Sequence, residues 1–87
     1  MNTGWRYVLT PHAMRAMERL PAAIQRRIYA ALDRLVSDIH SCDVRKLAGH
    51  DREFRLRVGD FRVVFGVEAE DRVYIVIEVT DRKDAYR

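Results

Sequence analysis

Hydrophobic residues recur along this chain with a helical period in the first half and with a period of two in the second. A short alternating run, Trp5–Leu9, is rich in strand formers and predicts a first strand. Thr10-Pro11 is typical of a helix start, because threonine caps free amide groups and proline fits the first helical position. The first helix is therefore expected from about Pro11 to Arg19. Its apolar face would consist of Ala13, Met14, Met17 and Leu20.

A second helix is expected from about Pro21 to Ile39, since Pro21 ends the first helix and can open the next. Apolar residues recur there at helical spacing along one stripe, and charged residues occupy the opposite face. The stripe consists of Ile24, Ile28, Leu32, Leu35, Val36 and Ile39. The polar run from His40 to Gly49 is interpreted as a loop.

Three strands are predicted after this loop. Phe54–Val58 and Phe61–Val67 alternate between apolar and other residues, and Gly59-Asp60 between them indicates a tight turn. Ala69–Asp71 is a second turn, and Val73–Val79 is an almost wholly apolar strand. The order β-α-α-β-β-β predicts an α+β fold in which a helical hairpin packs on one face of a four-stranded, mainly antiparallel sheet.

Composition is that of one small globular domain spanning residues 1–87, with 48% hydrophobic and 33% charged residues. A single cysteine, Cys42, cannot form an internal disulfide, and no run of 18 apolar residues predicts a membrane span. We therefore expect a cytoplasmic protein with no membrane contact. Of the 16 basic residues only Lys46 and Lys83 are lysines, and this arginine bias favours a nucleic-acid ligand.

Arginines gather on one predicted surface. Alternation places Arg55 and Arg57 on the strand face opposite the apolar residues, and the turn brings Arg62 close to Arg57. The chain end could add Arg82 and Tyr86. Guanidinium groups bind phosphate and tyrosine stacks on unpaired bases, so this set is suited to RNA. The alternative is an ordinary solvated sheet face whose arginines pair with acids of the same chain.

Three segments together resemble the RelE/ParE toxin superfamily, and most closely its RelE branch. They are Lys46–Gly49, Phe54–Phe65 and Asp81–Arg87. The resemblance implies the RelE-like microbial ribonuclease fold and a toxin of a toxin–antitoxin pair. Such toxins enter the ribosomal A site and cleave the messenger RNA there by attack of a 2′-hydroxyl on the adjacent phosphate, without a metal or another cofactor, which inhibits translation.

The resemblance also implies a role for each residue of the set. Arg55 and Arg57 would hold the phosphates and the attacking hydroxyl, and Arg62 would stabilise the five-coordinate phosphorane. Arg82 would assist the leaving 5′-oxygen, and Tyr86 would stack on the substrate base. Electrostatic stabilisation by fixed arginines can supply much of the acceleration.

The proton acceptor stays open. Some RelE-like toxins carry a lysine at the position of Arg57, but arginine stays protonated and is a poor base. Asp81 and His50 are the candidates, and a solvated His50 or an Asp81 paired with Arg82 is the alternative. The histidines and the cysteine lack metal-ligand spacing, so no metal site is expected.

Three functions remain in competition: the ribosome-dependent endoribonuclease, a ParE-like inhibitor of gyrase, and a catalytically degenerate toxin that only binds its antitoxin. All three predict a cognate antitoxin with an acidic, partly disordered segment that orders on binding. The first adds the ribosome and its message as partners. Arginines of the second helix would be a second contact with ribosomal RNA or simply a solvated face. They are Arg26, Arg27 and Arg34.

Overall fold

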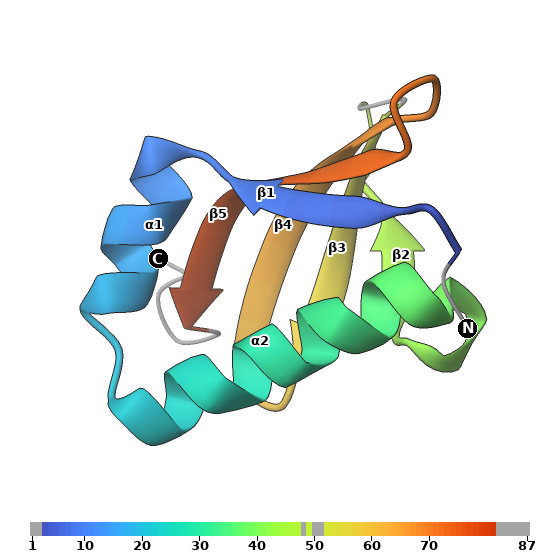
Figure 1. The fold of residues 1–87 in the computed structure, drawn as a ribbon. Helices are drawn as coiled ribbons and strands as arrows, with labels where there is room; N and C mark the ends of the chain where they lie inside the picture. Colours follow the sequence, from blue (N-terminus) through green and yellow to red (C-terminus); the bar gives the residue numbers. More distant parts are fainter. Residues whose placement is uncertain (1–2, 48, 50–51, 82–87) are drawn as a thin grey trace.

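The computed structural model describes residues 3–47, 49 and 52–81. Five strands form one sheet in the order β1-β5-β4-β3-β2, with β1 parallel to β5 and the other neighbours antiparallel (Figure 1). The elements are β1 (Arg6–Leu9), α1 (Pro11–Glu18), α2 (Ala22–Ser37), the 3-10 turn η1 (Ile39–Ser41), β2 (Val44–Lys46), β3 (Glu53–Val58), β4 (Phe61–Glu68) and β5 (Val73–Asp81).

The expected α+β class with a helical hairpin on one face of the sheet is confirmed, but the expected number of four strands is wrong. The segment interpreted as a loop, His40–Gly49, contains part of η1 and the additional strand β2. Three residues are too few for alternation to be recognised. The strand exists because β2 pairs with the edge of β3, with Val44 opposite Leu56.

Thr10 anchors the start of α1 to the sheet. Its Oγ1 accepts a hydrogen bond from the backbone N–H of Ala13 at 3.1 Å, while its own backbone N–H donates to the carbonyl of Val76 in β5 at 2.9 Å. Ala13 and Met17 are buried, but Met14 is 42% exposed, so its expected place in the core is wrong. Among the described residues, no helix is long and apolar enough to cross a membrane.

The core lies between the two helices and one face of the sheet (Figure 1). Alpha-helical spacing in α2 buries Ile28, Leu32 and Leu35, and period-two spacing in β4 buries Val63 and Phe65. All of these belong to the same cluster as Ala13 and Met17 of α1. Both helices therefore cover the same face of the sheet. The remaining side chains of β3 and β4, which alternate with the buried ones, lie on the opposite face.

Candidate nucleic-acid interface

The outer face of the β3–β4 hairpin carries the arginines. Arg57 lies directly opposite Arg62 in the antiparallel register, and the next pair toward the other end of the hairpin, Leu56 and Val63, points into the core. Arg55 shares the outer face with Arg57, being two residues away on the same strand. The turn that sets this register contains Gly59, with a φ of +58° that glycine adopts without steric cost.

Strand β2 extends the same face at the sheet edge. Arg45 lies opposite Arg55 in the register, and the backbone carbonyl of Asp43 accepts a hydrogen bond from the N–H of Arg57 at 3.0 Å. A pocket of about 220 Å³, called here the arginine pocket, is lined by these strands and the turn. Its lining consists of Asp43, Arg45, Arg55, Arg57, Gly59, Asp60, Phe61 and Arg62.

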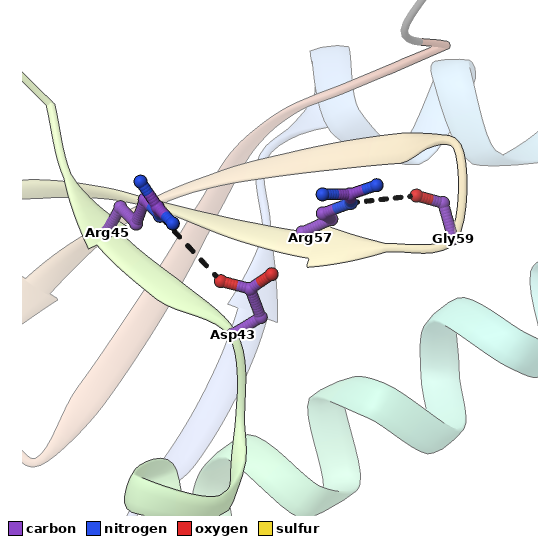
Figure 2. Close-up of polar contacts among 4 residues, drawn as sticks. All are labelled: Asp43, Arg45, Arg57 and Gly59. Atoms are coloured by element: carbon purple, nitrogen blue, oxygen red, sulfur yellow. Dashed lines mark hydrogen bonds and ion pairs between the residues drawn. The ribbon is translucent and has the colours of Figure 1, made fainter.

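Positive charge dominates the arginine pocket, with four arginines against two aspartates. Figure 2 shows two of its polar contacts: Asp43 lies 4.0 Å from Nε of Arg45, and Nε of Arg57 donates to the carbonyl of Gly59 at 3.4 Å. The Asp43–Arg45 pair is weak because its side chains are 52% and 75% exposed, respectively. The backbone bond orients Arg57 but leaves its charge uncompensated.

Acids of the same chain do not neutralise all the arginines on the outer face of the hairpin. Within the described part of the chain, neither Arg55 nor Arg57 forms an ion pair. Like charges held this close raise the energy of the folded state, and a bound anion would lower it. The guanidinium forks suit phosphate oxygens, which they can contact through two parallel hydrogen bonds.

The structure brings together three of the five predicted site residues, Arg55, Arg57 and Arg62. Arg82 and Tyr86 lie outside the described residues, as does His50, one candidate for the proton acceptor. The other candidate, Asp81, ends β5 and lies opposite Phe61 in the register with β4.

Sequence reasoning missed Asp43 and Arg45, because the segment that contains them was interpreted as a loop. The available signal was the inward Val44 beside the outward Arg45, which is too short to distinguish a strand from a coil. Among the described residues, no group of three histidine, cysteine, aspartate or glutamate side chains is arranged to hold a metal ion.

The family comparison points to toxin–antitoxin systems. A family model described as the ParE toxin of the type II toxin–antitoxin system parDE matches residues 7–86. The chain is also similar to RelE1 of Methanocaldococcus jannaschii, with 38% identity over 45 residues. That match covers 52% of this chain and 50% of RelE1, so the chain spans about half the length of this curated relative.

Solved structures share the fold. The chain is similar to a chain of the archaeal RelE–RelB complex from Pyrococcus horikoshii OT3, with a TM-score of 0.77, 29% identity and coverage of 94% of this chain and 97% of the other. It is also similar to a chain of the intact E. coli RelBE toxin–antitoxin complex, with a TM-score of 0.73, 21% identity and coverage of 88% and 95%. The second likeness shows the fold alone.

Proposed function

The chain belongs to the ParE toxin family of type II toxin–antitoxin systems, and we propose that it is a RelE-like toxin that cleaves messenger RNA on the ribosome. The observation that carries the proposal is the register of the β3–β4 hairpin. It places Arg57 opposite Arg62, with Arg55 on the same face, around one pocket. Three converging guanidinium groups are what a phosphodiester needs when negative charge develops on it.

The proposed reaction is an internal transesterification. The 2′-oxygen of one ribose forms a bond to the adjacent phosphorus while the bond from that phosphorus to the 5′-oxygen breaks, leaving a 2′,3′-cyclic phosphate and a 5′-hydroxyl. Arg55 and Arg57 hold the phosphate oxygens and the attacking hydroxyl, and Arg62 stabilises the phosphorane. Arg82 assists the leaving oxygen, and Tyr86 stacks on the base.

Proton transfer in this reaction does not use Arg57, because a guanidinium stays protonated in proteins. The proton of the 2′-hydroxyl goes to Asp81, to His50 or, if neither acts as a base, to solvent water, and solvent water protonates the leaving 5′-oxygen. No metal ion enters the proposed reaction, since the positive charge that a metal would supply comes from the arginines.

An antitoxin is part of the proposal. The similar P. horikoshii and E. coli structures are complexes of RelE with RelB. In this chain four arginines line the arginine pocket, and two of them, Arg55 and Arg57, form no ion pair within the described residues, which suits an acidic segment. Such a segment would order across the arginine pocket and block the approach of RNA. The proposed toxin is then inactive until the antitoxin is removed.

One alternative has an observation of its own, because the matching family model is that of ParE. A ParE-like toxin would act by inhibiting gyrase and would perform no chemistry on RNA. The ribonuclease and the gyrase inhibitor would have the same fold, so an activity assay is needed to distinguish them.

The test uses purified ribosomes stalled on a defined message with an empty A site. We expect the protein to cleave this message within the A-site codon, and a single 2′-deoxy substitution at the cleaved nucleotide to prevent cleavage because the nucleophile is gone. Arg62→Ala should lower the cleavage rate by about 10²–10³-fold. The matched control is Arg15→Ala, since Arg15 is exposed on α1, and this variant should cleave normally.

A gyrase supercoiling assay runs in parallel with the same preparations. An intact message together with inhibited supercoiling would reject the ribonuclease and favour the ParE-like function. Full cleavage by Arg62→Ala would reject the assignment of the arginine pocket as the site.

A further inference from the structure

One arginine of α2 reaches the β3–β4 turn. A methyl group added at Gly59 would lie 2.6 Å from Nη2 of Arg27 and 3.4 Å from its Cζ. The guanidinium of Arg27 is therefore in contact with the Gly59 backbone. Apart from Gly59 and its two neighbours in the chain, the three atoms nearest to such a methyl group all belong to Arg27. Among the helix arginines, this contact singles out Arg27.

The turn thus carries a guanidinium group on each side. On the pocket side, Nε of Arg57 donates to the carbonyl of Gly59 at 3.4 Å (Figure 2). On the helix side, Arg27 covers the position where any other residue would place its Cβ. Gly59 lines the arginine pocket, so Arg27 extends the positive surface of that pocket around the end of the hairpin.

The charge of Arg27 is available to a ligand. Arg27 is exposed, and within residues 3–47, 49 and 52–81 it forms no ion pair. Asp60 is the acid in the turn itself, and it lines the pocket without pairing with Arg27. Two cations on one tight turn repel each other, and an anion bound at each of them would relieve this repulsion.

We propose that Arg27 is a substrate-binding residue that holds a phosphate of the message adjacent to the cleaved one, as the RNA strand passes over the β3–β4 turn. This inference rests on the proposed ribonuclease function. Successive phosphates of a single strand need successive cations, and the two sides of the turn supply them. A side chain at position 59 would displace the guanidinium of Arg27, and the φ of +58° at Gly59 disfavours any residue other than glycine there.

The position of Arg27 excludes a direct role in the chemical step. It is absent from the lining of the arginine pocket, so it does not touch the reacting phosphate. It contributes equally to binding the ground state and the transition state, and its loss should weaken binding without slowing the bound complex.

The experiment measures single-turnover cleavage of the stalled ribosomal message while the protein concentration is varied. Arg27→Gln should raise the half-saturating concentration about tenfold, while the maximal rate stays within about twofold. The logarithm of the half-saturating concentration should also depend less steeply on the logarithm of salt concentration, by about 0.7 for one lost phosphate contact. Arg27→Lys should recover part of the affinity.

Arg26→Gln is the matched comparison, because Arg26 is an exposed neighbour on the same helix. We expect it to leave the half-saturating concentration unchanged. Equal losses in Arg26→Gln, Arg34→Gln and Arg27→Gln would overturn the proposal and favour a general contact of the helix face with ribosomal RNA. A wild-type value in Arg27→Gln would also overturn it.

A double-mutant cycle tests the link to the turn. Gly59→Ala should weaken binding in the wild-type background and have a smaller effect on binding when Arg27 is already glutamine. Thermal unfolding of each variant checks that the fold is kept. Should Arg62→Ala cleave at the full rate, the proposed function fails, whereas normal binding by Arg27→Gln with an inactive Arg62→Ala rejects this inference alone.

Discussion

The two faces of the β3–β4 hairpin differ in almost every physical property although they alternate along the same strands. The inner face carries Leu56, Val63 and Phe65, which are at most 2% exposed. The outer face carries Arg57 and Arg62, which line the arginine pocket. One alternating pattern therefore separates the residues that stabilise the fold from those that are available to bind a ligand.

Register keeps the two faces apart. The pair Leu56–Val63 is adjacent in the ladder to the pair Arg57–Arg62, and a slip of one residue would bury the guanidinium groups and expose the core. Burying unpaired charges is costly, so the burial of the apolar inner face fixes the register and keeps the arginines on the outer face. Substitutions on the two faces should therefore change different measurements.

The largest expected effect is on the inner face. Phe65 is fully buried and contacts Phe54 and Tyr74, with ring centroids 5.8 and 5.4 Å apart, respectively. Phe65→Ala should lower the free energy of unfolding by about 3–5 kcal/mol, because it leaves a cavity in the core. Urea unfolding measures this change. Val64→Ala, one residue away on the outer face, should cost much less, and equal costs would contradict the separation of the faces.

The next effect is on the outer face and appears in activity instead of stability. Arg57→Ala should reduce cleavage of the ribosomal message by about 10²–10³-fold. Its free energy of unfolding should change by less than about 0.5 kcal/mol, since Arg57 is exposed and forms no ion pair in the described part of the chain. The comparison fails if Arg57→Ala loses activity only in proportion to a loss of folded protein.

The smallest effect concerns pH. Burial raises the pKa of Tyr74, with a smaller contribution from Cys42. The unfolded chain then loses this proton at lower pH than the folded chain, so stability is fully present below pH of about 10 and is lost as the pH rises above it. Tyr74→Phe should flatten the decline of the free energy of unfolding as the pH rises above about 10, as measured by urea unfolding.

The outer face should not share this dependence, because no tyrosine of the described residues lines the arginine pocket. A decline as steep in Tyr74→Phe as in the wild type would show that Tyr74, which packs against Phe65 of the inner face, does not carry the alkaline sensitivity. Tyr7→Phe is a second variant for the same measurement, since burial foremost, then Asp33 and Tyr29, raise the pKa of Tyr7.

Local patterns were enough to predict much of the fold and part of the candidate site. The spacing of Ile28, Leu32 and Leu35 predicted α2, and Thr10-Pro11 predicted the start of α1. The residues around Gly59-Asp60 predicted a hairpin with its arginines on one face. These features depend on neighbours within a few residues, so the amino-acid sequence alone determines them.

Contacts between distant segments were decided only by the tertiary structure. Strand β2 exists because an edge of β3 was free to pair with it, and Met14 is exposed because α1 packs on β5 through its other residues. Arg27 meets Gly59 because α2 crosses the sheet near the turn. Each of these features depends on how whole elements pack against one another, so the periodicity of a single segment cannot predict it.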